Sequence, residues 1–334
     1  MRNHSDILLY ENHLDQSIIY PEIGDATPTP EEMAYLSALL DGYRNGFKTK
    51  YRYNIDEIPL EEKYKKGSLA VTVANRTYRA QRIEGITGGR ILFRGMPESV
   101  PDIKDLSLNP LLLNALIDPR LNRGGLILIS GSPGNGKSTT IASAIIARLQ
   151  AYGGLCLTLE DPPEMPLDGI YNRGVCIQQD VDAEQFADAL KQTLRSYPSG
   201  INNMLLLGEV RDAETAEIAI RSANDGRLVF MTMHAGNNLQ AIKVLLSRTE
   251  DSLGHSQARQ LLGNSCRLFV HQQLKKDPRN PEKKILHAEM LQDTQAVASI
   301  ISNPETNLDH INNEQAMQNN IVKLRQKIEL RPIY

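Results

Sequence analysis

The sequence has few cysteines, no long apolar run and no strong charge imbalance, and each absence excludes a class of protein. The three cysteines, Cys156, Cys176 and Cys266, have no paired spacing, which indicates neither a disulfide framework nor a zinc site and fits a reducing cytoplasm. No uncharged apolar run approaches about 18 residues and no N-terminal signal is present, so we expect any membrane contact to be peripheral. The net charge of −3 argues against a chain that binds mainly nucleic-acid phosphates.

One basic cluster interleaved with tyrosines stands out against this charge balance. We interpret it as a solvated face, and a local nucleic-acid face is the alternative. Its members are Lys48, Lys50, Arg52, Lys63, Lys65 and Lys66, together with Tyr51, Tyr53 and Tyr64.

Length and composition predict two domains. The chain has 334 residues, of which 41% are hydrophobic, enough for a substantial core. Residues 1–96 mix short alternating runs with turn signals, which predicts a small α+β domain. Residues 97–120 contain four prolines around one apolar stretch, which is typical of a linker with a short helix.

Residues 121–334 carry the pattern of an α/β domain. Strand-like runs at 126–129, 155–159, 204–207 and 228–233 alternate with helical patterns. Such alternation predicts a parallel sheet wrapped by helices. After residue 239 the pattern is helical, apart from a predicted hairpin around 277–281, and it ends in a polar helix near 313–330.

The most informative motif is a phosphate loop between the first of these runs and a helical stretch. Residues 131–138 fit G-x-x-x-x-G-K-[ST] without a mismatch, and Ile141, Ile145 and Leu149 follow at helical spacing. Its backbone N–H groups can surround phosphate oxygens, Lys137 can neutralise the outer phosphates and Ser138 can ligate Mg²⁺. We therefore predict a nucleotide site that includes Ser132, Pro133, Gly134, Asn135, Gly136, Lys137, Ser138 and Thr139.

Polar residues that end the later strand runs supply the remaining catalytic candidates. Glu209 follows an apolar run, where a carboxylate can hold metal or orient water, or can be an acid at a helix N-terminus. Glu160 and Asp161 end the preceding run, so Glu160 can polarise water or belong to an ordinary acidic turn. His234 ends the fourth run and can contact the γ-phosphate or be a satisfied core histidine.

These segments, in this order, resemble the type II/type IV secretion ATPases. Gly208-Glu209-x-Arg211-Asp212 is the most diagnostic piece, because this family carries Gly-Glu where most ATPases carry Asp. Arg195 matches an arginine that the family has just before this strand, and residues 270–274 resemble its segment after the core. Ser5-Asp6-Ile7 is similar to the start of its PAS-like N-terminal domain. The matching segments are 131–138, 159–164, 205–212 and 228–234.

The resemblance implies a RecA-like ATPase domain, a smaller PAS-like domain, and a hexameric ring that hydrolyses ATP with Mg²⁺. It implies that Arg79, Arg90, Arg94 and Arg195 bind nucleotide, the first three from the N-terminal domain at the γ-phosphate. Loss of that phosphate would remove the contacts that favour domain closure. Each of those three arginines can alternatively be a solvated surface charge.

Within the family the chain looks nearest the PilT-like pilus retraction motors and the related type IVB secretion and conjugative motors. It lacks the long N-terminal extension and four-cysteine zinc module of many relatives. Arg227 stands where a first histidine is usual, and Asn135 is unusual in the loop. Residues 296–301 occupy the region of a retraction signature without its Arg-Asn pair.

The resemblance therefore implies a cytoplasmic motor that works with a platform protein at the bacterial inner membrane. The net charge leads us to expect no direct binding of nucleic acid. A conjugative nucleic-acid transfer ATPase and a non-motor P-loop kinase or switch are the alternatives. The sequence has no Asn-Lys-x-Asp guanine motif and no Leu-Ser-Gly-Gly-Gln string, which argues against a GTPase and an ABC-type protein.

Overall fold

The chain folds into two compact units. The computed structural model describes residues 6–20, 28–51, 68–86, 88–182, 185–210, 212–323, 328, 330 and 331. The first unit comprises Met1–Ser99 with Glu160–Pro166 and Asp180–Ala183, and the second comprises Val100–Leu159, Leu167–Gln179 and Glu184–Tyr334. The second unit thus begins inside the predicted linker.

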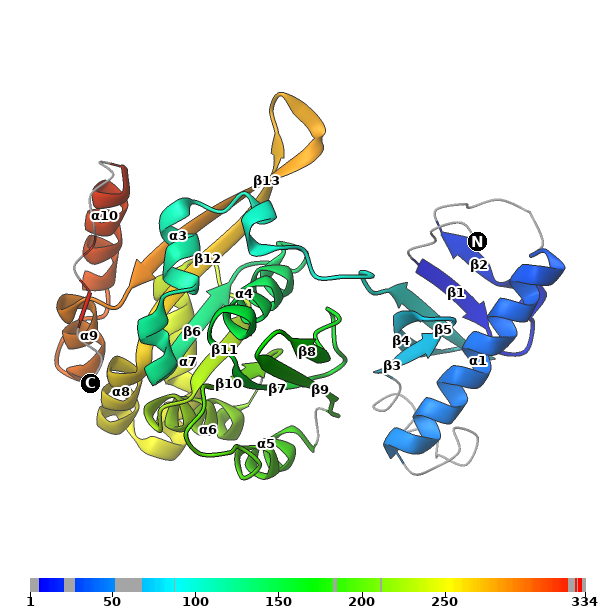
Figure 1. Cartoon of the computed structure of the whole chain (residues 1–334), viewed down its shortest axis with the longest axis horizontal. Coiled ribbons are helices and arrows are strands. Elements are labelled where there is room, and N and C mark those ends of the chain that lie inside the picture. The colour runs from blue at the N-terminus through cyan, green and yellow to red at the C-terminus, as the bar shows by residue number, and fades with distance from the viewer. Residues whose placement is uncertain are drawn as a thin grey trace. The chain divides into compact units, whose positions relative to one another are not determined.

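The first unit contains an antiparallel five-stranded sheet in the order β2-β1-β5-β4-β3, with the long helix α1 packed on it (Figure 1). This arrangement agrees with the predicted α+β domain. The elements are β1 (Asp6–Tyr10), the 3-10 helix η1 (Leu14–Gln16), β2 (Ile18–Tyr20), α1 (Pro30–Tyr51), β3 (Ser68–Val73), β4 (Arg76–Gly85) and β5 (Gly88–Gly95).

Helix α1 packs because its apolar residues recur at helical spacing on one face. Leu36, Leu39, Tyr43 and Phe47 have no exposed surface and join the core of the sheet. Gly46 allows a close approach, since a Cβ there would lie 2.7 Å from Leu69 Cδ1. On the outside of this helix Lys48 is exposed, whereas Arg52, Lys63, Lys65 and Lys66 of the basic cluster lie outside the described residues.

The second unit is built on an eight-stranded sheet in the order β13-β12-β6-β11-β10-β7-β9-β8. The four predicted strand runs lie in β6, β7, β10 and β11, which are parallel to one another, and β12 extends the parallel part beside β6. The α/β prediction is therefore confirmed. The strands are β6 (Gly125–Ser130), β7 (Gly154–Glu160), β8 (Gly169–Tyr171), β9 (Gly174–Asp180), β10 (Asn203–Leu207), β11 (Leu228–Met233), β12 (Cys266–Asp277) and β13 (Asn280–Gln292).

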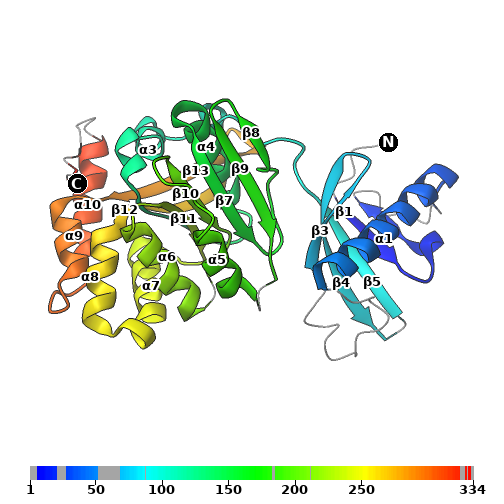
Figure 2. The same ribbon diagram turned by 60° about the horizontal axis from the view of Figure 1, so that its bottom comes forward.

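Helices cover both faces of this sheet, with α3 and α4 on one face and α6, α7 and α8 on the other (Figure 2). Strands β6 and β11 are consequently buried along their whole length. The helices are η3 (Ile103–Leu106), α3 (Pro110–Leu116), η4 (Pro119–Arg123), α4 (Lys137–Tyr152), α5 (Phe186–Leu194), α6 (Ala213–Asn224), α7 (Asn238–Leu253), α8 (His255–Ser265), α9 (Gln295–Ser302) and α10 (His310–Lys323). None of the helices in the described part of the chain is long and apolar enough to span a bilayer.

Most of the predicted linker is bonded to helix α4. Ser143 Oγ donates to the Pro101 carbonyl at 2.8 Å, and Tyr152 Oη donates to the Ile117 carbonyl at 2.6 Å. Between them, the buried Arg148 donates to the Asp118 carbonyl at 2.9 Å, and burial lowers the pKa of its guanidinium to about 10. Residues 100–123 therefore belong structurally to the second unit.

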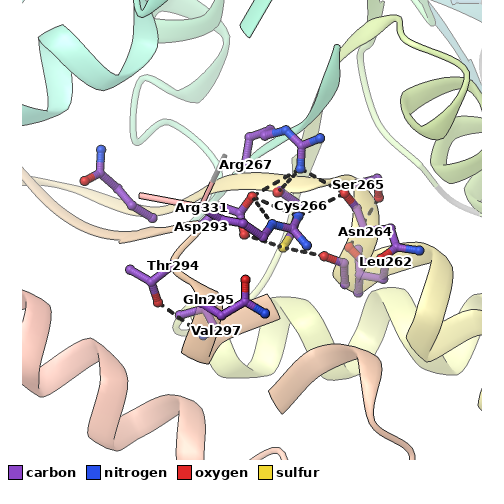
Figure 3. Close-up of polar contacts among 12 residues, drawn as sticks. Leu262, Asn264, Ser265, Cys266, Arg267, Asp293, Thr294, Gln295, Val297 and Arg331 are labelled. Atoms are coloured by element: carbon purple, nitrogen blue, oxygen red, sulfur yellow. Dashed lines mark hydrogen bonds and ion pairs between the residues drawn. The ribbon is translucent and has the colours of Figure 1, made fainter. Parts of the chain in front are cut away.

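A buried carboxylate anchors the C-terminal segment of the described chain. Asp293 Oδ2 accepts from Arg331 Nη2 at 2.9 Å and from Arg267 Nη1 at 3.1 Å, and its backbone carbonyl accepts from Arg331 N (Figure 3). Burial raises the pKa of Asp293, although both arginines act in the opposite direction. Arg331 thus fastens residues near the end of the chain to the start of α9.

Candidate nucleotide-binding site

The phosphate loop joins the end of β6 to the start of α4, as its sequence predicts. Gly131, Gly134 and Gly136 have φ angles of +147°, +75° and +77°, in a region that favours glycine. Helix α4 follows directly, and the N-terminus of a helix is a favourable place to bind an anion. Lys137 Nζ donates to the Gly131 carbonyl at 2.8 Å and to the Ser132 carbonyl at 3.1 Å, so the ammonium group bridges the start of the loop.

His234 connects this loop to the neighbouring strands. It follows β11, which lies directly beside β6 in the sheet. Its Nδ1 lies 3.1 Å from the Gly131 carbonyl, which can only accept, so Nδ1 carries the proton. Its Nε2 lies 3.8 Å from Glu209 Oε1. The side chain is 49% exposed, which excludes a core histidine and leaves it accessible to a ligand at the loop.

Glu209 lies at the carboxyl end of β10, one strand beyond β11. Thr232 of β11 donates its hydroxyl to the Gly208 carbonyl, which fixes the backbone just before this carboxylate. The N-cap of the following helix α6 is Asp212, whose carboxylate accepts from Thr215 N at 2.8 Å. Glu209 is therefore not the acid that caps the helix, and its carboxylate is directed instead to His234.

Glu160 is the last residue of β7, and only 6% of it is exposed. Gly208 N donates to the Leu159 carbonyl at 3.0 Å, which keeps β7 and β10 in register up to their carboxyl ends. Glu160 is a buried carboxylate at a strand end rather than part of an open acidic turn.

The three arginines predicted from the N-terminal domain lie on one face of the five-stranded sheet. Arg79 of β4 is directly opposite Arg94 of β5, and Arg90 lies on the same face of β5 because side chains alternate along a strand. Two like charges placed directly opposite each other are destabilising unless anions accompany them. Here Arg94 pairs with Asp6 at 3.8 Å, and Arg79 pairs with Glu164, a residue of the same unit, at 2.8 Å.

Comparison with known proteins identifies the family. Residues 62–325 match the family described as type II/IV secretion system protein. The chain belongs to this secretion family. It is 31% identical over 248 residues to the uncharacterized protein YggR of Escherichia coli, a match that covers 72% of each chain. It is 33% identical over 183 residues to the type II secretion system protein E of Klebsiella pneumoniae, covering 54% of this chain and 35% of that relative.

A solved structure extends the likeness of this secretion-family chain to both units. The pilus retraction motor PilT, crystallised with bound ADP, superposes with a TM-score of 0.69 at 24% sequence identity. The alignment covers 97% of this chain and 87% of that chain. At this identity the match establishes the shared fold, including that of the small N-terminal domain.

Arg195 is the one predicted nucleotide ligand in the second unit that the structure does not bring to the loop. It follows α5 and precedes β10, so it lies near the amino end of β10. The loop lies at the opposite edge, because β10 and β6 are both parallel to β11. Strands of this length span about 17–20 Å. Arg195 therefore does not reach the nucleotide site of its own chain.

Two departures from the secretion-family pattern have clear structural settings. Arg227 precedes β11, at the amino edge, where its guanidinium lies 5.4 Å from the Tyr197 ring centroid and far from the loop. Residues 296–301 lie in α9, whose Val297 and Ile301 are buried. Arg259 donates to the carbonyls of Ile300 and Ile301 at 2.6 Å, so this helix end is satisfied within the chain.

The sequence did not indicate the residues of β12 that border the loop. Gln272 is 1% exposed and bonds to the loop, and His271 Nδ1 lies 3.2 Å from Ser130 Oγ at the end of β6. Burial lowers the pKa of His271. Residues 270–274 resemble a segment of the family, but they contain no periodicity or motif that predicts a contact with residues 131–140.

Proposed function

We propose that this chain is the subunit of a hexameric ATPase motor that powers type IV pilus assembly, retraction or secretion. The observation that carries the proposal is the line of contacts from the phosphate loop through His234 to Glu209. It brings the phosphate loop, His234 and Glu209 to one edge of one sheet, which supports assigning them as the phosphate-binding backbone, the γ-phosphate sensor and the water-orienting carboxylate. The reaction is hydrolysis of ATP by water to ADP and phosphate.

The residues present fit a Mg²⁺–ATP complex. Mg²⁺ uses one or two protein oxygens and takes its remaining ligands from phosphates and water. Ser138 at the start of α4 and Glu209 are the two oxygen donors we assign to it. When bound, the ion would neutralise charge that develops on the phosphates. Within the described residues no group of three or more His, Cys, Asp or Glu forms a metal cage.

The chain's own groups would then divide the chemistry. Lys137 holds the outer phosphates, Glu209 accepts a hydrogen bond from the attacking water and orients it, and Glu160 assists by polarising water. His234 contacts Gly131 and Glu209 together, so it can report whether a γ-phosphate is present. Phosphate leaves with the water oxygen attached, and ADP stays in the loop until release.

The test compares turnover with binding. Glu209→Gln keeps the shape and removes the charge, so we expect unchanged binding of a fluorescent ATP analogue and phosphate release slowed by about 100-fold or more. Lys137→Ala should lose both. Glu214→Gln is the matched control, since Glu214 is an exposed residue in the first turn of α6 that pairs with Lys191. Normal turnover in Glu209→Gln would make that carboxylate structural.

We further propose that Arg79, Arg90 and Arg94 contact the γ-phosphate and thereby couple hydrolysis to movement. Their shared face and paired register support this, because three guanidinium groups on one surface form an anion-binding site. Arg94→Ala should weaken the effect of an ATP analogue on the small-angle scattering profile. An unchanged nucleotide-dependent profile in that variant would contradict the assignment.

The family relationship supports a homohexamer that acts in the cytoplasm, held at the inner membrane by a platform protein. Light scattering with and without an ATP analogue tests ring formation. A monomer that phosphorylates a metabolite would favour the P-loop kinase, and turnover stimulated by DNA would favour the nucleic-acid transfer ATPase.

A further inference from the structure

Strand β12 continues past the end of its neighbour β6. The pairing of these two strands ends at His271 and Ser130, where β6 gives way to the phosphate loop, yet β12 extends to Asp277. The backbone of β12 therefore presents an open edge beyond His271. The tip of the phosphate loop fills it, because Leu274 N donates to Asn135 Oδ1 at 3.1 Å.

A buried carboxamide makes a second connection to the same tip. Gln272 Nε2 donates to the Asn135 carbonyl at 2.7 Å. Its Oε1 accepts from Thr140 Oγ1 at 3.0 Å, and Thr140 lies in the first turn of α4. One side chain thus ties both ends of the phosphate-binding segment to β12.

The contact between loop and strand is also steric. A Cβ at Gly131 would lie 2.3 Å from the Gln272 carbonyl oxygen, and one at Gly136 would lie 3.2 Å from Gln272 Nε2. Apart from its two chain neighbours, no atom of the described residues lies within 4 Å of a Cβ at Gly134, so the loop touches β12 on one side and is open on the other. The open side is where a phosphate can enter.

We propose that Gln272 and the Asn135 side chain are positioning residues that hold the phosphate loop in its binding shape before nucleotide arrives. This inference rests on the proposed nucleotide-binding function. A loop already held in place loses less conformational freedom on binding, so the same phosphate contacts give a higher affinity. It also explains the unusual Asn135, whose short amide supplies an acceptor for Leu274 N without adding a negative charge near phosphate.

The experiment measures the affinity of the full chain for Mg²⁺–ADP with a fluorescent ADP analogue. Gln272→Met removes both hydrogen bonds and nearly preserves volume, and we expect its dissociation constant to rise about ten- to thirtyfold. Asn135→Ala should give a rise of about tenfold. The double variant should bind more weakly than either single variant, because the Asn135 side chain and the Gln272 side chain make separate hydrogen bonds between the loop tip and β12.

Gln318→Met is the matched control. Gln318 is also 1% exposed, and it makes two hydrogen bonds, at 2.8 and 3.0 Å, to the backbone of Gln292. Gln292 is the last residue of β13 and lies away from the loop. Gln318→Met should lower thermal stability by about as much as Gln272→Met does, but its dissociation constant for the ADP analogue should stay within about twofold of wild type. If Gln272→Met does not fold, Asn135→Ala alone decides the question, since Asn135 is only half-buried.

The possible outcomes distinguish a failure of the positioning role from a failure of the proposed nucleotide-binding function. Wild-type protein that binds no nucleotide would remove the proposed function. Wild-type binding with unchanged affinity in folded Gln272→Met or Asn135→Ala would overturn only the positioning role. A loss of affinity in Gln318→Met equal to that in Gln272→Met would assign the effect to general destabilisation and would also overturn it.

Discussion

The packing of the phosphate loop on β12 predicts a large difference between two neighbouring glycines. Gly131 and Gly134 both have positive φ angles, so alanine at either position strains the backbone by about 2 kcal/mol. Only at position 131 does the new methyl group meet backbone, 2.3 Å from the Gln272 carbonyl oxygen. Such overlap adds about 2 kcal/mol. We expect Gly131→Ala to lower the free energy of unfolding by about 4 kcal/mol and Gly134→Ala by about 2 kcal/mol.

Urea denaturation without nucleotide, followed by circular dichroism, measures both losses under the same conditions. Gly134→Ala is the control for backbone strain, because it shares the positive φ and has no neighbour within 4 Å of the added carbon. The difference between the two variants therefore isolates the contact with β12. Equal losses, within about 0.5 kcal/mol, would refute the close approach of the loop to this strand.

Three further predictions concern single side chains. Burial lowers the pKa of His271 in the folded state below 6.5, so the unfolded chain binds the proton first as the pH falls. Below pH 6.5 the thermal stability of wild type should therefore fall relative to that of His271→Asn. Parallel pH profiles of the two proteins would contradict this. Asp212→Ala should destabilise the second unit by about 1 kcal/mol through loss of the α6 N-cap, whereas Asp212→Asn should retain most of it in the same denaturation assay. Arg331→Met should lower the unfolding free energy by about 2 kcal/mol at pH 7. Without Arg331, Asp293 is a buried carboxylate whose pKa is already raised, so the deficit should shrink as the pH falls and Asp293 gains a proton. A deficit that does not depend on pH would exclude the ion pair as its cause.

Local sequence patterns predicted the parts of the fold that depend on neighbouring residues. The apolar runs at 126–129, 155–159, 204–207 and 228–233 became strands, and the glycine-rich motif became the loop, because each is determined within a few residues. The convergence of Glu209 and His234 also followed, since parallel strands bring their carboxyl ends to one edge. Strands β8 and β9 were not predicted.

Contacts between distant segments were not predictable in the same way. Nothing in residues 266–277 indicates that this strand lies beside β6, so the bonds from Gln272 to Asn135 and Thr140 had no local signal. Arg195 was assigned to the nucleotide through the family resemblance, and its position at the other edge follows only from the observed arrangement of α5 and β10. That Arg79 lies opposite Arg94 could be known only from the register of β4 and β5. That Arg90 and Arg94 share a face follows from the alternation of side chains along one strand.

The hydrogen bonds between α4 and residues 100–123 provide a fixed reference from which movement of other parts of the chain can be measured. Ser143, Arg148 and Tyr152 fasten that segment to the helix that starts at the phosphate loop, so the two should travel as a single rigid piece. Spin labels at the exposed positions Lys104 and Gln150 should keep one separation in every nucleotide state. Any change in distance from Lys104 to a label within residues 6–95 would then report displacement of the small N-terminal sheet alone.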